Sequence, residues 1–298
     1  MIFFLSLLNF FSMENFFSRL LNYVLDVLLS TFNQLFILFG PLLVLVVLLN
    51  LSAIFSARMS VRFWGRNLFL YGFGWLGCSV HELSHALFAL VFGHKINEIE
   101  LFKPNNNGES LGHVSHSYDK NSIYQKIGNF FIGISPLLSG GIVLFFSTLL
   151  LFRFNITDLS SFRISTHIFT DLELLKQVGL NIWSSLISYS TLVFVGAAAV
   201  WWKSALLIFI LYSTGSSMTL SKSDVGSALS GFLWVIVIFL VFNLITLWIG
   251  NFVIIFLEKI VRYISGFYFL LILSLIANLL FITILVILNL IKSLLIRR

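Results

Sequence analysis

Charged side chains are scarce in this 298-residue sequence: Asp, Glu, Lys and Arg make up 10% of it, whereas 59% is hydrophobic. Soluble domains carry about a quarter charged residues, so this composition excludes an ordinary water-soluble domain. The single cysteine, Cys78, excludes an internal disulfide framework. The formal charge of +6 is spread thinly along the chain. This distribution argues against a nucleic-acid surface and fits contact with the anionic headgroups of a lipid bilayer.

The N-terminal segment lacks two features of a removable signal peptide. No Lys or Arg precedes its apolar run, and no small-residue cleavage site follows it, so we expect the segment to be retained. From Ser12 to Asn33, polar residues recur every three or four positions, which places them on one stripe of a helix. The sequence therefore predicts an N-terminal amphipathic helix within residues 1–33, lying in the membrane interface or lining a helix bundle.

Long apolar runs recur along the rest of the chain, each with the roughly 20 residues that a transmembrane helix needs. We expect an all-α polytopic membrane protein with about six spans. Its predicted parts are a first span and basic turn (34–66), a core (67–256) and a C-terminal span (257–298). Spans are expected near 34–56, 67–93, 123–152 and 179–213, followed by two apolar segments that meet near Glu258. Lys and Arg are distributed too evenly to assign sidedness.

The polar stretch over residues 94–122 predicts a small β-hairpin. Residues 95–103 (KINEIELFK) alternate apolar and polar side chains, as a strand does. Pro104 to Gly108 form a turn-favouring cluster, and residues 110–118 (SLGHVSHSY) are suited to a returning strand.

The motif HELSH, from His81 to His85, lies inside one of the apolar runs. Helix positions four apart point in similar directions, so His81 and His85 can bind one Zn²⁺. Glu82 lies about 100° round the helix, where it can hold a water on that metal. Zinc acidifies its water and polarises a carbonyl, while Glu82 takes the proton and passes it to the leaving amine. Peptide hydrolysis is the predicted reaction.

A metal site explains this motif better than the structural alternative. The chain has only six histidines, so a chance match is rare. Two histidines and a glutamate inside an apolar span are also costly without a metal or a polar partner. The alternative is that these residues form ordinary hydrogen bonds between helices.

A catalytic zinc takes three protein ligands and keeps one position open, so a third ligand is needed. His94 follows His85 by nine residues, which places it on the opposite helix face. Alternation of the spans puts residues 214–224 on the metal's side, and Asp224 is the predicted third ligand. The same alternation of spans puts the other candidate acids on the opposite side of the membrane from the metal: Asp158, Asp171, Glu173 and Glu258.

Two other interpretations remain open at this point. Ser221 or Ser223 could cap the helix, with Asp224 in its first turn only favouring the helix dipole. His113 and His116 share the predicted side of the metal, and we assign them first to a loop, with a substrate or regulatory role as the alternative.

These motifs resemble the site-2 protease family of intramembrane zinc metalloproteases. His81, Glu82 and His85 match the family's HExxH, and the segment from Ser223 to Gly226 (SDVG), with Asp224, loosely resembles its Leu-Asp-Gly ligand motif and departs from it on both sides of the aspartate. Residues 67–256 carry the resemblance, which includes weaker matches at Gly112-His113-Val114 and Ser135-Pro136-Leu137. It implies cleavage of a membrane-embedded protein substrate near the cytoplasmic face, and we expect the cell (inner) membrane of a bacterium.

A helical substrate hides its peptide bonds in internal hydrogen bonds and must unwind before it can be cleaved. The hairpin over residues 96–116 is a candidate edge for the unwound segment. Two other functions compete with proteolysis. A di-iron membrane oxygenase needs more histidine ligands than six scattered residues supply. A zinc transporter or other nonenzymatic zinc-binding protein is the stronger rival, because intramembrane His, Glu and Asp also mark ion paths.

Overall fold

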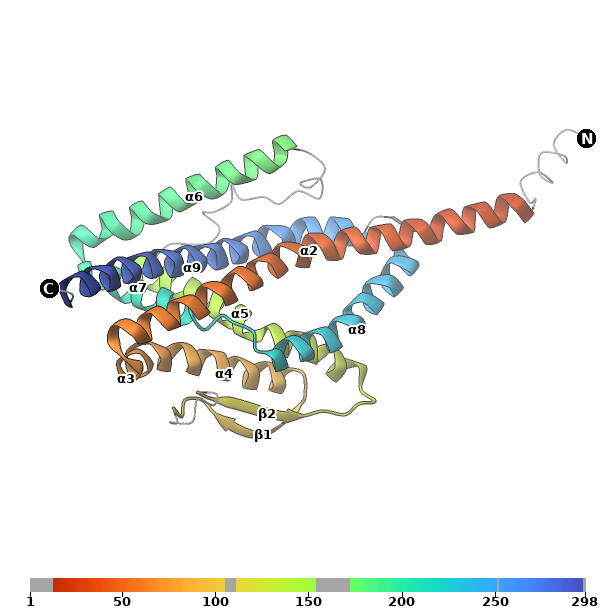
Figure 1. Cartoon of the computed structure of the whole chain (residues 1–298). Coiled ribbons are helices and arrows are strands. Elements are labelled where there is room, and N and C mark those ends of the chain that lie inside the picture. Colours follow the sequence, from red (N-terminus) through yellow and green to blue (C-terminus); the bar gives the residue numbers. More distant parts are fainter. Residues whose placement is uncertain (1–12, 105–110, 154–171, 251, 297–298) are drawn as a thin grey trace, which may run out of the picture.

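A computed structural model describes residues 13–104, 111–153, 172–250 and 252–296, and these are mostly helical (Figure 1). In chain order its elements are α2 (Met13–Trp64), α3 (Arg66–Phe69), the π-helical turn η1 (Leu70–Gly74), α4 (Trp75–Val91), β1 (Lys95–Glu100), β2 (His113–Ser117), α5 (Ile123–Phe152), α6 (Leu172–Ala199), α7 (Trp201–Gly215), α8 (Lys222–Thr246) and α9 (Phe252–Ile296). A helical membrane architecture with one small hairpin is therefore confirmed.

Four of the described helical segments are long and apolar enough to cross a membrane: Phe16–Trp64, Ile123–Phe152, Lys222–Thr246 and Ile264–Leu295. Many of their Leu, Ile, Val and Phe side chains are exposed, as suits a surface in contact with lipid. The chain is thus a multi-pass membrane protein.

The predicted count of about six spans is not confirmed. The expected span at 67–93 contains a short helix and a π turn before α4, and the one at 179–213 is divided at Val200 between α6 and α7.

Two predicted boundaries between helices also differ from the structure. The amphipathic helix and the first span form one continuous helix, α2, because nothing between them stops a helix; residues 1–12 of the prediction lie outside the described residues. The C-terminal apolar segments separate between Thr246 and Phe252 rather than near Glu258. Glu, Lys and Arg are good helix formers, so the charged cluster around Glu258 continues α9.

The predicted hairpin is confirmed for its two strands. β1 and β2 pair antiparallel, from Lys95 opposite Ser117 to Glu100 opposite His113, with an irregularity between Ile96 and Glu98. The turn cluster between the strands lies largely outside the described residues. The hairpin lies alongside α4, so it covers the helix that carries HELSH (Figure 1).

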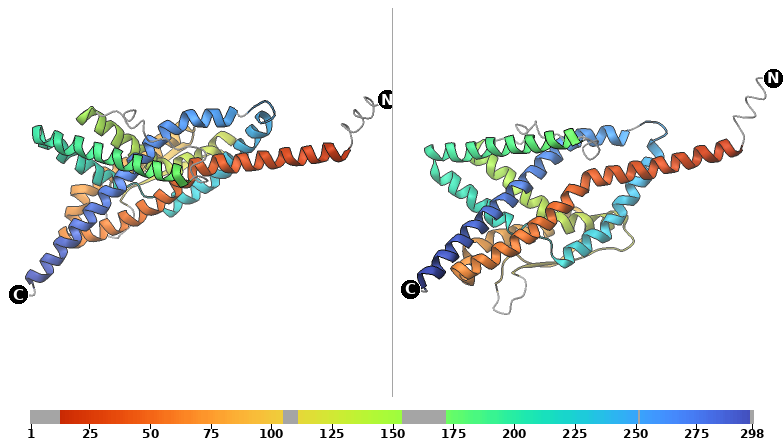
Figure 2. Two further views of the ribbon diagram at one scale, coloured as in Figure 1. Left: turned by 90° about the horizontal axis from the view of Figure 1, so that it is seen from above. Right: turned by 45° about the horizontal axis from the view of Figure 1, so that its top comes forward.

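The hydrophobic core is formed mainly by α2, α5, α7, α8 and α9, and α2 packs against α9 (Figure 2). Close approach of α5 and α8 depends on glycine. A Cβ on Gly133 would lie 2.5 Å from the backbone oxygen of Asp224, and one on Gly231 would lie 2.1 Å from the backbone nitrogen of Phe130. Small residues at such crossings let membrane helices meet backbone to backbone. This contact places the start of α8 beside α4.

Candidate metal centre

The three predicted metal ligands meet in space. His81 and His85 project from one face of α4, and Asp224 comes from the first turn of α8. The Nε2 atom of His85 lies 3.3 Å from Asp224 Oδ1, and that of His81 lies 3.7 Å from Asp224 Oδ2. Their ligand atoms all fall within 4.8 Å of one another, in the only such group of three among the described residues.

Backbone carbonyls orient both imidazoles. His81 Nδ1 lies 2.9 Å from the oxygen of Ser217, and His85 Nδ1 lies 2.9 Å from the oxygen of Ile132. A carbonyl only accepts, so each Nδ1 carries the hydrogen and donates it. Each Nε2 then has a free lone pair, which is the tautomer that a metal ligand needs.

The facing nitrogens test whether this site fits a cation. The two Nε2 atoms are 3.2 Å apart, and both point toward the Asp224 carboxylate. Two lone pairs and a carboxylate repel one another unless a proton or a cation lies among them. The two nitrogen donors and one oxygen donor therefore fit a divalent metal ion, and Asp, Glu and His side chains of this kind bind zinc in proteins.

Asp224 serves as a helix cap and faces the histidines at the same time. Ser221 is the N-cap of α8: its hydroxyl accepts from the backbone nitrogen of Asp224, and Asp224 Oδ2 accepts from the backbone nitrogen of Ser221 at 2.7 Å. The second carboxylate oxygen, Oδ1, is the one nearest His85. The two interpretations of Asp224 are therefore compatible, because Oδ2 accepts the capping hydrogen bond while it also lies near His81, and Oδ1 is left to face His85.

Glu82 lies in the same cavity as the three ligands. This cavity measures about 260 Å³ and is lined by His81, Glu82, His85, Gly112, His113, Val114, His116, Ile132, Gly133, Ser221, Ser223, Asp224 and Ser227. Glu82 is 9% exposed. A Cβ on Gly112 would lie 2.8 Å from Glu82 Cγ, so the chain entering β2 packs directly over this glutamate.

Three further histidines lie near this centre among the described residues, whereas His167 is outside them. His113 and His116 belong to strand β2, not to a loop, and both line the cavity. Their assignment to a loop was wrong because the strand begins at His113 itself. His113 also lies between two glutamates of β1, Glu98 at 3.3 Å and Glu100 at 3.4 Å. His94 follows α4 and does not line the metal cavity, as predicted.

His94 and His116 form a pair outside the metal ligands. Their Nδ1 atoms are 3.0 Å apart, and the His94 ring stacks on Tyr118. Burial lowers the pKa of both imidazoles, and for His116 the neighbouring His94 lowers the pKa further. Both rings are therefore held in the neutral form more strongly than a free histidine is.

Of the other acids considered from the sequence, Glu173 is the one whose side chain is described, and it does not join the centre. Glu173 lies exposed on α6 with Lys176 as its neighbour. Asp158 and Asp171 lie outside the described residues, and Glu258 is in α9 with no side-chain description.

Sequence reasoning missed the two carbonyls that orient the histidines, because a backbone oxygen has no residue signature. It also missed Asn129, a buried carboxamide on α5. A polar residue inside an apolar span is a signal that could have identified it.

Comparisons with known protein families, with curated proteins and with solved structures found no match. The interpretation of the site therefore depends on its own geometry.

Proposed function

We propose that this chain is an intramembrane zinc metalloendopeptidase of the site-2 protease type, which hydrolyses peptide bonds of membrane-embedded protein substrates. One observation carries the proposal: two imidazoles in the ligand tautomer and a carboxylate converge beside Glu82 in one cavity. Three protein ligands and a neighbouring carboxylate are the minimum set for metal-assisted hydrolysis. We place the protein in the cell (inner) membrane of a bacterium.

His81, His85 and Asp224 would hold the zinc ion. When bound, the ion supplies Lewis acidity toward water and toward the carbonyl of a peptide bond. The carbonyls of Ser217 and Ile132 keep the two rings aligned, so the ligands do not reorganise during the reaction.

Glu82 is the proposed general base and acid. The carboxylate takes a proton from the attacking water as the water oxygen bonds to the carbonyl carbon, and it passes a proton to the amine nitrogen as the C–N bond breaks. Its position under Gly112, 9% exposed, keeps bulk water from competing for that proton.

The substrate segment must be extended near the centre, because a helix hides its peptide bonds. The β2 strand reaches the cavity at His113, Val114 and His116. Its edge is our proposed guide for the unwound substrate. Proline substitutions along this edge should slow cleavage, and unchanged cleavage would count against the guide.

Glu82→Gln tests the proposal. The full chain is reconstituted into vesicles with zinc and with a library of single-span fusion proteins, and cleavage is followed by mass spectrometry. The variant should bind zinc like the wild type and lose cleavage by roughly 100-fold or more. The matched control is Glu173→Gln on exposed α6, which should cleave normally.

The same vesicles distinguish a protease from a transporter. A zinc-sensitive dye inside them should record no protein-dependent flux. Zinc flux that His81→Ala abolishes, together with no cleavage by the wild type, would mean that the protein is a zinc transporter and not a protease.

A further inference from the structure

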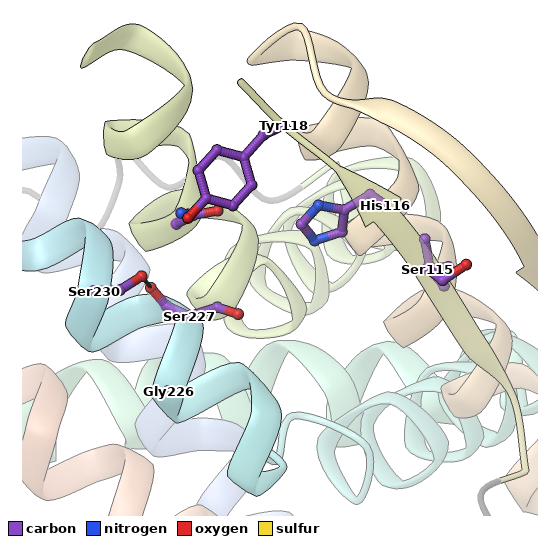
Figure 3. Close-up of a pocket in the computed structure, with 8 residues that line it drawn as sticks. Ser115, His116, Tyr118, Gly226, Ser227 and Ser230 are labelled. Carbon is purple, nitrogen blue, oxygen red and sulfur yellow. Dashed lines mark hydrogen bonds between the residues drawn. The ribbon is translucent and has the colours of Figure 1, made fainter. Parts of the chain in front are cut away.

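A second cavity of about 440 Å³ adjoins the metal centre (Figure 3). It is lined by Val114, Ser115, His116, Tyr118, Asn129, Gly226, Ser227 and Ser230. In Figure 3, Ser227 and Ser230 of α8 face the strand side, which carries Ser115, His116 and Tyr118. Three of these residues, Val114, His116 and Ser227, also line the metal cavity. The two cavities are therefore neighbours with a common wall.

Asn129 is the unusual member of this wall. Its side chain is 4% exposed, and its carboxamide has no hydrogen-bond partner within the part of the chain that the structure describes. Neither polar atom of this carboxamide is among the fully buried unpaired atoms of the described residues, so both are open to the cavity, and an apolar group that covered them would cost about 1–3 kcal/mol. Because Asn129 lines the cavity, a ligand or water in the cavity can supply the missing partners, one donor and one acceptor.

The hydrogen-bonding pattern of His116 follows from its neighbours. His94 Nε2 lies 2.9 Å from the oxygen of Gln125, so this nitrogen donates and His94 Nδ1 accepts. His116 Nδ1 then donates to His94 Nδ1. This leaves His116 Nε2 as an acceptor, so the wall offers a neutral imidazole rather than a cation.

The remaining polar groups of the wall are uncharged as well. Tyr118, Ser227 and Ser230 provide hydroxyl groups, and no Asp, Glu, Lys or Arg of the described residues lines the cavity. Ser230 Oγ donates to the oxygen of Ser227 at 2.8 Å, which leaves its lone pairs free to accept. A charged ligand would have no counter-ion here, and an apolar ligand would leave Asn129 unpaired.

We propose that this cavity is a specificity subsite, which binds an uncharged carboxamide or hydroxyl side chain of the polypeptide whose peptide bond reaches the metal centre. The inference rests on the proposed proteolytic function. Asn129 donates one hydrogen bond to that side chain and accepts another from it. His116 Nε2 and the α8 serines accept its remaining hydrogens. A substrate with Asn, Gln, Ser or Thr at one fixed position from the cleaved bond is preferred.

Peptide hydroxamates test the subsite without cleavage, because the hydroxamate binds zinc and the peptide extends from it. Zinc-bound full-length protein in nanodiscs is titrated with hydroxamates that carry Asn, Leu, Asp or diaminopropionic acid at the first, second or third position. At one position, Asn should bind roughly tenfold more tightly than Leu or Asp. Asn129→Leu should remove this preference and keep zinc.

Asn129→Asp is a second variant of nearly the same shape. Its carboxylate should reverse the order, so that diaminopropionic acid, an isosteric cation, binds more tightly than Asn. A purely structural role for Asn129 predicts no such reversal. The matched control is Asn289→Leu on α9. Within the described part of the chain, the Asn289 side chain donates to the Leu285 oxygen of its own helix, so this variant should retain the Asn preference.

The outcomes separate the two proposals. The subsite proposal is overturned if all side chains bind equally at all positions, or if the preference for Asn survives Asn129→Leu. Neither result contradicts the proposed protease function. Failure of every hydroxamate to bind the zinc-containing protein overturns the proposed protease and the subsite together.

Discussion

His94 and His116 face each other through their Nδ1 atoms at 3.0 Å, so one of the two nitrogens carries a hydrogen and the other accepts it. The contact joins the turn after α4 to strand β2. It ties the hairpin to the helix that carries His81 and His85.

Lower pH should weaken this contact between His94 and His116. Burial lowers the pKa of both imidazoles in the folded protein, so the unfolded chain binds more protons below the unfolded histidine pKa of about 6.5. The stabilisation is complete above that pH and is lost as the pH falls through the lower folded values. The protection factors of the β2 amides, which correct for the pH dependence of the intrinsic exchange rate, should fall between pH 7.5 and 5.5. His94→Gln should flatten this dependence, and an unchanged slope would contradict the assignment.

The two roles of Asp224 can be separated. Asp224→Asn keeps an oxygen that accepts from Ser221 but removes the charge, so zinc binding should weaken by roughly tenfold or more while stability changes little. Ser221→Ala removes the cap, so it should cost about 1 kcal/mol of unfolding free energy and spare zinc binding. Zinc titration and denaturant unfolding measure both. Equal zinc loss in the two variants would mean that Asp224 is only a cap.

Gly133 should control the position of Asp224. A methyl group there would lie 2.5 Å from the Asp224 backbone oxygen, which cannot rotate away, so α8 must shift. We expect Gly133→Ala to lower the free energy of unfolding by about 1–3 kcal/mol and to weaken zinc binding. Gly179→Ala on α6 is the matched control, because nothing lies within 4 Å of its added carbon. Normal zinc affinity in Gly133→Ala would refute the coupling.

Zinc should stabilise the folded protein. A metal that bridges α4 and α8 binds the folded state selectively, so a hundredfold excess over the Kd adds about 2.7 kcal/mol. Chelation should lower the melting temperature, and added zinc should restore it. His81→Ala should abolish the zinc-dependent shift. A shift that persists in this variant would place the zinc elsewhere.

Local patterns predicted the features that depend on short stretches of chain. Scarce charge and long apolar runs indicated the membrane, strand alternation indicated the hairpin, and the spacing of His81 and His85 placed both on one helix face. These follow from the period of a helix or strand, which nearby residues determine. The helix boundaries were less predictable: Val200 divides a run whose hydrophobicity is continuous.

Only tertiary packing decided how the site is assembled. Counting spans selected Asp224, but its approach to His85 depends on the glycine contact between α5 and α8. The orientation of the two imidazole rings depends on the backbone oxygens of Ser217 and Ile132. The cavity beside Asn129 forms because α8 packs against α5 and faces β2, which both come much earlier in the chain. Hydropathy and periodicity specify which faces are buried, whereas side-chain volume at each crossing sets which residues meet.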